Sequence, residues 1–172
     1  FYRTGKWFSG EWEGVVPDLI CIGKAMSGGF PISACVGKEE VMDQWPESPG
    51  EALHTSTFLG HPVGCAMALK SLEMFERDTT IRVVEEASER LSSALQEFDH
   101  EAVREVRGRG LMWGLELNRP AGGLLTSLLA EGILFLVDGP EGNVLSFTPP
   151  FQISEGELDY ALTALRRLLD AS

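Results

Sequence analysis

The sequence is poor in the residues that build disulfide frameworks and metal sites. It has three cysteines and three histidines, all scattered, and no CxxC pair. An odd number of irregularly spaced cysteines argues against a disulfide framework, and the histidines show no zinc-ligand spacing. We therefore predict no metal site. Cys21 and Cys65 stand among apolar residues, so we expect both to be small buried core residues.

Basic residues are also scarce. Fourteen lysines and arginines stand against 26 aspartates and glutamates, which gives a formal net charge of −12. A surface of this sign repels nucleic-acid phosphates and anionic membranes, so neither is an expected partner. No apolar run reaches the length of about 18 residues that a membrane span needs.

The beginning of the chain shows neither an initiator methionine nor a targeting segment. It starts at Phe1 and runs directly into turn residues. We therefore expect an N-terminal portion to be missing from this chain. Unpaired cysteines suit a reducing compartment, which favours a cytoplasmic location.

The remaining composition is that of a folded protein, with 44% hydrophobic and 23% charged residues. The continuous apolar run Leu19–Ile22 is bounded by turn residues, which predicts a strand buried on both faces of a mostly parallel sheet. A second strand is expected over Ile32–Val36, followed by a short helical turn over Lys38–Met42. This first part therefore predicts an α/β arrangement.

The pattern changes near residue 76, after which a small α+β unit is expected. Pro62 suits the first position of a long helix, and Ser154 with Glu157 forms a capping-box pattern before the last helix. Between them the periodicity predicts the following elements: a helix over 79–98, antiparallel strands over Val103–Arg107 and Leu111–Leu117, a helix over Leu124–Glu131, and strands over Ile133–Val137 and Val144–Phe147.

Lys24 is the most informative candidate for chemistry. It directly follows a predicted buried strand, at the kind of sheet edge where α/β proteins bind ligands. Apolar surroundings would favour the neutral, nucleophilic amine, which forms Schiff bases with carbonyl compounds. A surface lysine at a strand end is the alternative. A phosphate loop of the Walker type is excluded, because Ala25 and Asp18 occupy positions that require a hydroxyl residue and a glycine.

Hydroxyl residues precede the helix predicted at Pro62. Thr55, Ser56 and Thr57 stand before its N-terminus, where free amides and the helix dipole favour an anion. Ser56 and Thr57 are therefore candidates for binding a phosphate. The alternative is that they cap the helix and fill a turn. The basic turn at Arg107-Gly108-Arg109 is interpreted as solvated structure.

Four segments together resemble the class III pyridoxal-phosphate-dependent aminotransferases, the ornithine, acetylornithine and 4-aminobutyrate group. They occur in the family's order and span nearly the whole chain. The segments are Arg3-Thr4-Gly5-Lys6, Pro17-Asp18-Leu19-Ile20 through Gly23-Lys24-Ala25 and Gly28-Gly29-Phe30-Pro31-Ile32, then Ser56-Thr57-Phe58-Leu59-Gly60-His61-Pro62, and Val144-Leu145-Ser146-Phe147-Thr148-Pro149-Pro150. The lysine segment carries the most specific likeness.

The resemblance implies a fold and a domain division. The chain would be the carboxy-terminal part of the aspartate-aminotransferase-like (type I) fold, of class α/β. Residues 1–76 would form the end of the large mixed-sheet domain, with the cofactor lysine and the start of the interdomain helix. Residues 77–172 would form the small α+β domain.

The resemblance also implies an activity. Lys24 matches the lysine that forms a Schiff base with pyridoxal 5'-phosphate, in a transaminase that moves an amino group from an amine or amino acid to a 2-oxo acid. Thr57 matches the threonine that binds the cofactor phosphate of the neighbouring subunit, with Ser56 assisting. A homodimer with shared active sites is implied.

Two departures from the family pattern bear on function. The family's aspartate that pairs with the cofactor's ring nitrogen would precede Phe1, so this chain alone is expected to be incomplete for transamination. Ser146 stands where many members have an arginine that binds the substrate carboxylate, so the amino donor is left open. The alternatives are a racemase or aminomutase of the same fold, or a non-catalytic truncated chain.

Overall fold

The computed structural model describes residues 1–51 and 54–171, which form two compact units. The first unit comprises Phe1 and Gly10–Thr80, and the second comprises Tyr2–Ser9 and Ile81–Ser172. The units divide after Thr80, and a short N-terminal arm groups with the second unit. The domain boundary that the sequence predicts at residue 76 lies four residues before this division, and it stays a prediction.

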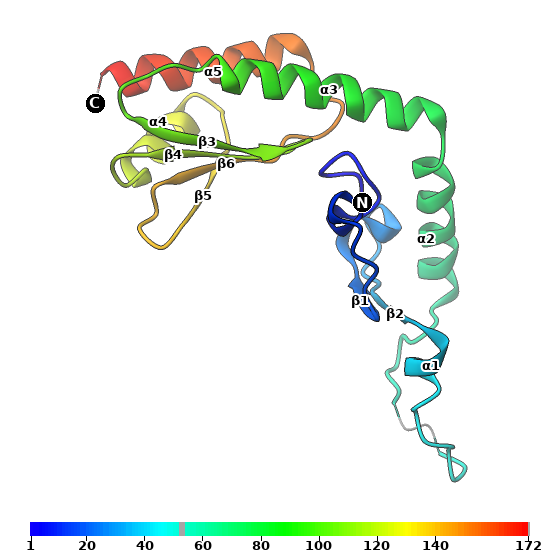
Figure 1. The fold of residues 1–172 in the computed structure, drawn as a ribbon. Helices are drawn as coiled ribbons and strands as arrows, with labels where there is room; N and C mark the ends of the chain where they lie inside the picture. The colour runs from blue at the N-terminus through cyan, green and yellow to red at the C-terminus, as the bar shows by residue number, and fades with distance from the viewer. Residues whose placement is uncertain (52–53, 172) are drawn as a thin grey trace. The chain divides into compact units, whose positions relative to one another are not determined.

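The first unit contains short elements and one long helix (Figure 1). In chain order the elements are η1 (Ser9–Glu13), β1 (Leu19–Ile22), η2 (Lys24–Ser27), β2 (Ala34–Gly37), α1 (Glu39–Met42) and α2 (Pro62–Phe75). The helix α2 begins at its proline as predicted, because a fixed φ suits the first helical position and the missing N–H is not needed there. The strands and the short helix also lie close to their predicted ranges.

The pairing of β1 was predicted wrongly. β1 and β2 form an antiparallel two-stranded ribbon, in which Leu19 lies opposite Gly37 and Ile22 lies opposite Ala34. The expected burial on both faces is absent, since 49% of Leu19 is exposed. The burial alternates along β1, so one face of the two-stranded ribbon is uncovered among the described residues.

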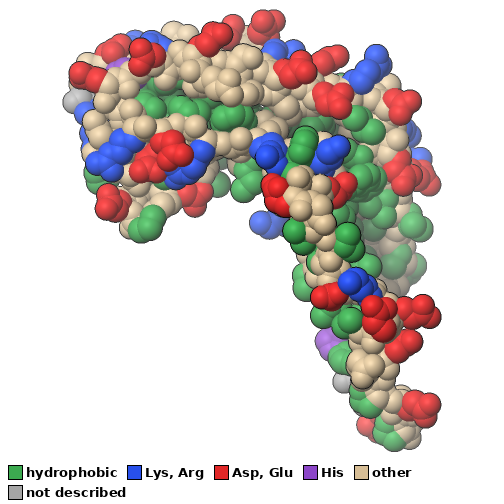
Figure 2. Space-filling view, viewed as in Figure 1, with side chains coloured by type: hydrophobic (Ala, Val, Ile, Leu, Met, Phe, Trp, Pro, Cys, Tyr) green, Lys and Arg blue, Asp and Glu red, His purple; other side chains and the backbone are tan. Residues whose placement is uncertain are grey.

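Large hydrophobic side chains remain at the surface of the first unit. Figure 2 shows them along α2, where Val63, Leu69 and Met74 are about half exposed or more. Soluble monomers rarely expose contiguous apolar patches of this kind. The first unit therefore has less of a core of its own than the second.

The second unit is a four-stranded antiparallel sheet with three helices. Its elements are α3 (Asp78–Gln96), β3 (Val103–Arg109), β4 (Met112–Leu117), α4 (Gly122–Ala130), β5 (Leu136–Asp138), β6 (Val144–Phe147) and α5 (Glu155–Asp170). The strand order is β3-β4-β6-β5. In Figure 1 the long helices α3 and α5 run along one side of this sheet. Every predicted element of this unit is present, and the β3–β4 pair is antiparallel as expected.

The core of the second unit lies between the sheet and the helices. Leucines from α3, α5 and the strands are fully buried there: Leu91, Leu95, Leu115, Leu145 and Leu165. On α3 the buried positions recur every three or four residues, which the amphipathic pattern predicted. The capping box of α5 is also confirmed, because the Ser154 hydroxyl accepts from the Glu157 N–H while the Glu157 carboxylate accepts from the Ser154 N–H.

The N-terminal arm Tyr2–Ser9 packs within the second unit. The Leu111 N–H donates to the Arg3 carbonyl at 2.8 Å, and the Arg3 guanidinium donates to the Pro149 carbonyl. Gly110 lies so close to Thr4 that an added Cβ would stand 2.5 Å from the Thr4 carbonyl carbon. Only a glycine fits this close approach at a φ of 63°. Partial burial lowers the pKa of Arg3.

Candidate active site

Lys24 occupies an unusual backbone position at the end of β1. Its φ is 48°, in the left-handed region that non-glycine residues seldom adopt. Lys24 begins the short helix η2, which ends at Ser27 and is followed by the C-cap residue Gly28 with a φ of 65°. Strain of this kind costs free energy and is concentrated at functional sites. Among the described residues Lys24 shares this feature with one other non-glycine residue, Tyr2, whose φ is 54°.

The environment of Lys24 differs from the expectation. Its side chain is exposed, whereas the sequence predicted a stem in apolar surroundings. The reason is the same as for Leu19, since the β1–β2 ribbon has one uncovered face. The buried residues of η2 are instead Met26 and Ser27.

Helix α2 provides the support for the lysine segment. The Ser27 hydroxyl donates to the Phe30 carbonyl, which fixes the turn after η2. Gly64 in the first turn of α2 is buried against Phe30, and a Cβ there would stand 2.9 Å from two atoms of the phenyl ring. The ring also stacks on His61 with a centroid distance of 5.0 Å. The lysine segment and the hydroxyl segment therefore meet at the start of α2.

Ser56 and Thr57 lie in an exposed turn that leads into α2. The Leu59 N–H donates to the Ser56 carbonyl at 3.1 Å, and Gly60 turns the chain with a φ of 65°. The N-cap residue of α2 is His61, whose side chain makes no capping hydrogen bond. The two hydroxyl residues therefore do not cap α2, but they do form part of the turn before it, as the alternative interpretation expected.

His61 was not predicted as a site residue. Its Nδ1 atom is buried and has no hydrogen-bond partner in the part of the chain that the structure describes. A buried polar atom without a partner carries a free-energy cost, so its presence needs an explanation. One indication of this residue was present in the sequence, because His61 stands where the similar segment of the family usually has an asparagine.

The remaining candidates lie in the second unit. The Ser146 hydroxyl donates to the Asp138 carboxylate across the β5–β6 pair. Arg107 is paired with Glu116 at 2.7 Å and with Glu105 at 2.9 Å, so the interpretation of this arginine as structural is supported. The hydrogen bond that Arg107 donates to the Glu116 carboxylate is the largest cause of the raised pKa of Arg107.

The cysteines depart from the expected burial. Cys21 and Cys35 are exposed, and Cys65 is half-buried. Cys21 belongs to the open face of the β1–β2 ribbon, so the prediction that it is a core residue is wrong. Cys65 on α2 is only partly enclosed.

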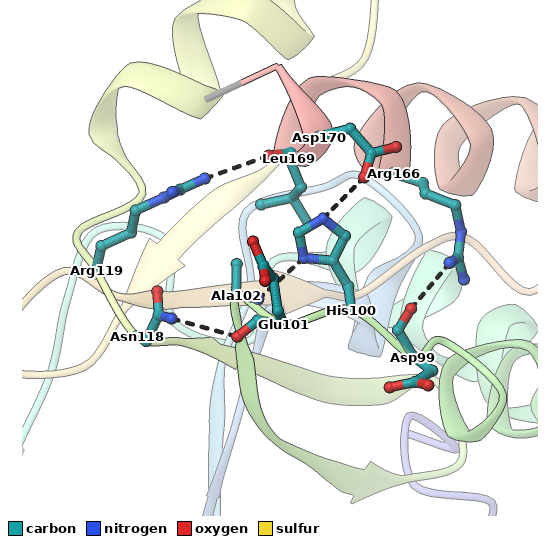
Figure 3. A network of polar contacts seen from close by, with 9 residues as sticks. All are labelled: Asp99, His100, Glu101, Ala102, Asn118, Arg119, Arg166, Leu169 and Asp170. Atoms are coloured by element: carbon teal, nitrogen blue, oxygen red, sulfur yellow. Dashed lines mark hydrogen bonds and ion pairs between the residues drawn. The ribbon is translucent and has the colours of Figure 1, made fainter.

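A polar cluster in the second unit joins the end of α5 to the loop after α3 (Figure 3). The Ala102 N–H donates to Nδ1 of His100 at 3.0 Å, which leaves the proton on Nε2, 3.1 Å from the Asp170 carboxylate. The Arg166 guanidinium donates to the Asp99 carbonyl at 2.9 Å. These bonds hold two chain segments together, which is a structural role.

The donor groups of the lysine segment and of the turn before α2 are together of the kind that suits an aldehyde that carries a phosphate. They combine a primary amine, two hydroxyls, and the N-terminus of a 14-residue helix beside the unpartnered His61 nitrogen. Within residues 1–51 and 54–171, no group of three or more histidine, cysteine, aspartate or glutamate side chains is placed to hold a metal ion. None of the helices in the same ranges has the length and apolar character needed to span a bilayer.

Comparison with known proteins identifies the class. Residues 1–169 match the family model for aminotransferase class-III, and the chain belongs to this family. The fold is an α/β part of the aminotransferase fold that binds pyridoxal phosphate, and class III members depend on this cofactor.

The most similar relatives include ornithine aminotransferases of bacilli. The chain is 38% identical to the enzyme of Bacillus cereus (strain Q1) over 168 residues, which is 97% of this chain and 41% of that protein. It is also 38% identical to the enzyme of Bacillus subtilis (strain 168), over 97% of this chain and 40% of that protein. The chain therefore spans about two fifths of the length of the curated relatives it matches.

Solved structures give the same result. The adenosylmethionine-8-amino-7-oxononanoate aminotransferase of Methanocaldococcus jannaschii has a TM-score of 0.82 at 30% identity, over 99% of this chain and 43% of that chain. The ornithine aminotransferase of Toxoplasma gondii, described with partial occupancy of PLP at its active site, has a TM-score of 0.79 at 30% identity, over 98% and 40% of the two chains.

Proposed function

We propose that the protein containing this chain is a pyridoxal-phosphate-dependent transaminase that acts through a Lys24 Schiff base. It moves an amino group from an amine or amino acid donor to a 2-oxo acid acceptor. The observation that carries the proposal is the strained backbone of Lys24, held beside the start of α2 in a class III family member. Bound pyridoxal phosphate supplies an aldehyde and an electron-withdrawing ring.

In this proposal Lys24 has two successive roles. Its amine first attaches the cofactor by condensing with the aldehyde. Once the amino donor displaces it, the free amine removes a proton from the carbon that bears the donor's amino group and later returns one. Both roles require a neutral amine with room to move. The exposed position of Lys24 gives its side chain the room to move.

Ser56 and Thr57 bind the cofactor phosphate in this proposal. Their exposed turn runs into the N-terminus of α2, where free backbone amides and the helix dipole favour an anion. We further propose a cytoplasmic homodimer, in which Thr57 binds the phosphate of the neighbouring subunit's cofactor. The chain then contributes only part of each site, which is supported by its coverage of 41% of the relatives.

Cofactor titration tests the proposal. The purified protein is titrated with pyridoxal phosphate, and the visible absorption that survives gel filtration is measured. We expect retention in the wild-type protein and in Lys38→Ala, because Lys38 is paired with Asp18 at 2.6 Å and is not available to the cofactor. Lys24→Ala should lose the retained absorption. Equal retention in Lys24→Ala and wild type would contradict the proposal.

A second arm of the titration tests the phosphate contact. Thr57→Ala should weaken cofactor affinity by about 1.5–3 kcal/mol, the range for a hydrogen bond to a charged group. Thr55→Ala is the matched control, since it removes a hydroxyl from the same exposed segment and should leave the affinity unchanged. Equal affinity in both variants would remove Thr57 from the site.

Mixed dimers test whether the sites are shared. One subunit carries Lys24→Ala and the other carries Thr57→Ala, with different affinity tags for purification. If Thr57 serves the neighbouring subunit, both defects fall in one site and the other site is intact. The mixed dimer then binds one cofactor per dimer with wild-type affinity. Absence of a wild-type site would show that each subunit binds its own cofactor.

A further inference from the structure

The ring of His61 contacts both segments that the proposed function assigns to the cofactor. It stacks on Phe30 of the lysine segment, with a centroid distance of 5.0 Å and an interplanar angle of 28°. It also contacts Phe58, with a centroid distance of 6.0 Å and an interplanar angle of 55°. Phe58 directly follows Thr57 in the turn before α2. One imidazole ring therefore joins the two segments within the first unit.

The backbone of His61 is fixed where the turn meets the helix. Its N–H donates to the Phe58 carbonyl at 3.1 Å, and its carbonyl accepts from the Cys65 N–H at 2.9 Å. The first bond belongs to the turn, and the second belongs to the first turn of α2. The start of the helix therefore sets the position of the ring and of the two rings that pack on it.

Ring contacts are the interactions that the structure gives the His61 side chain. In the described part of the chain it makes no capping hydrogen bond to α2, and its buried Nδ1 atom has no hydrogen-bond partner. A buried polar atom without a partner costs free energy, so this environment suits the ring rather than its nitrogen. Aromatic pairs at centroid distances of about 4.5–7 Å stabilise both partners.

Phe30 connects the ring contact to the backbone of Lys24. The Phe30 carbonyl accepts a hydrogen bond from the hydroxyl of Ser27, the last residue of the short helix η2 that Lys24 begins. Ser27 is buried, with 1% of its surface exposed. A displacement of Phe30 therefore moves the end of η2, and with it the strained backbone of the lysine.

We propose that His61 is a positioning residue, whose ring holds the lysine segment and the Ser56–Thr57 turn in fixed positions relative to each other. The inference rests on the proposed function, in which Lys24 binds the aldehyde and Thr57 binds a phosphate of the cofactor. Without the ring, each segment must become ordered when the cofactor binds, which lowers the affinity. The loss is a factor of about 2–12 for each aromatic pair removed.

Two related aldehydes separate the effects on the two segments. Pyridoxal phosphate uses both segments, whereas pyridoxal lacks the phosphate and uses the lysine segment alone. The affinity of the protein containing this chain for each compound is measured by absorption titration. In His61→Ala we expect the affinity for pyridoxal to fall about 2–12-fold, and the ratio of the affinities for pyridoxal phosphate and pyridoxal to fall by a further factor of about 2–12. A loss of folded protein lowers both affinities equally and leaves the ratio unchanged.

Three variants complete the titration. His61→Phe keeps a ring at this position and should retain both wild-type values, which attributes the effect to ring packing. Phe58→Leu removes the contact on the turn alone, so it should lower the ratio and leave the affinity for pyridoxal unchanged. His54→Ala is the matched control, since this imidazole contacts Trp45 at a centroid distance of 6.4 Å, and it should change neither value.

Amide hydrogen exchange gives a second measurement, on the cofactor-free protein. Peptides that cover Phe30 and Phe58 should exchange about 2–12 times faster in His61→Ala than in wild type, because the opening of each segment becomes easier. His61→Phe should exchange at the wild-type rate. Faster exchange together with an unchanged ratio would show a merely structural role and would overturn the proposal.

The outcomes distinguish this inference from the proposed function. Equal affinities of the wild-type protein for pyridoxal phosphate and pyridoxal would remove the phosphate contact, and the inference with it. A wild-type preference for pyridoxal phosphate that His61→Ala and Phe58→Leu both retain would overturn the inference and leave the proposed function in place. So would a failure of His61→Phe to restore the values that His61→Ala loses.

Discussion

The contact between α2 and the lysine segment gives the sharpest test of how the site is held. Gly64 is buried in the first turn of α2, where an added Cβ would stand 2.9 Å from two ring atoms of Phe30 and 3.3 Å from Ile32. Gly64→Ala therefore forces the ring away from the helix. Overpacking of this kind costs about 1–3 kcal/mol. Replacing a helical glycine by alanine returns at most about 1 kcal/mol.

We therefore expect the free energy of local opening in this region to fall by about 1–2 kcal/mol. This raises the equilibrium constant for opening by a factor of about 5–30. Amide hydrogen exchange measures it directly. Peptides that cover η2, Phe30 and the first turn of α2 should exchange about 5–30 times faster in Gly64→Ala than in wild type. The exchange rate rises by this factor because it is proportional to the equilibrium constant for opening. The second unit should be unaffected.

Gly156 supplies the matched control. It also lies in the first turn of a long helix, α5, but an added Cβ there meets nothing within 4 Å. Gly156→Ala should leave exchange in the lysine segment unchanged and should slightly stabilise α5. A double-mutant cycle of Gly64→Ala with Phe30→Leu should show a coupling free energy, because the two side chains clash directly. Equal exchange in Gly64→Ala and Gly156→Ala would show that the contact between Gly64 and Phe30 does not hold the lysine segment.

Three further predictions concern the second unit. Ser154→Ala should cost about 1 kcal/mol of unfolding free energy in urea, since it removes the cap of α5; no change would contradict it. Hydrogen bonds from the Ser154 N–H and hydroxyl lower the pKa of Glu157 below 4.5 in the folded state. Their stabilising effect is complete above the pKa of the unfolded state, and it is lost as the pH falls through the lower pKa of the folded state. Glu157→Gln should therefore flatten the loss of unfolding free energy on acidification, and an unchanged pH profile would refute this. Leu115→Ala, at a fully buried site, should cost about 2–5 kcal/mol in urea unfolding, whereas Leu134→Ala, which is 81% exposed, should change stability by less than about 0.5 kcal/mol; similar losses in both would be inconsistent with the core described above.

Local signals predicted the elements of the second unit well. Helix α3 follows from its apolar spacing, and α5 follows from the capping box at Ser154. Both signals lie within a few residues of sequence and act on the backbone directly. The unit's strands were also found near their predicted ranges, because the change from helical to alternating periodicity is a local property.

Long-range arrangement was not predictable in the same way. A short apolar run such as Leu19–Ile22 fits a parallel or an antiparallel neighbour equally well, and only the pairing with β2 decides between them. The same pairing places Cys21 opposite Cys35 and leaves both exposed. The packing of Arg3 against Leu111 joins residues 108 positions apart, for which no local pattern exists.

The candidate site was predicted in part. The order of motifs along the sequence singles out Lys24, Ser56 and Thr57, and the roles of these residues stay predictions. The strained backbone of Lys24 and the unpartnered nitrogen of His61 were not predicted, because backbone angles and hydrogen-bond partners depend on the packing of η2 against α2.

Chemical trapping of the cofactor identifies the lysine that forms the proposed Schiff base. The protein is incubated with pyridoxal phosphate, reduced with borohydride and digested, and the labelled peptide is identified by mass spectrometry. The chain has four lysines, at positions 6, 24, 38 and 70, so the result is unambiguous. We expect a label on Lys24. A label on Lys6, Lys38 or Lys70 in its place would contradict it.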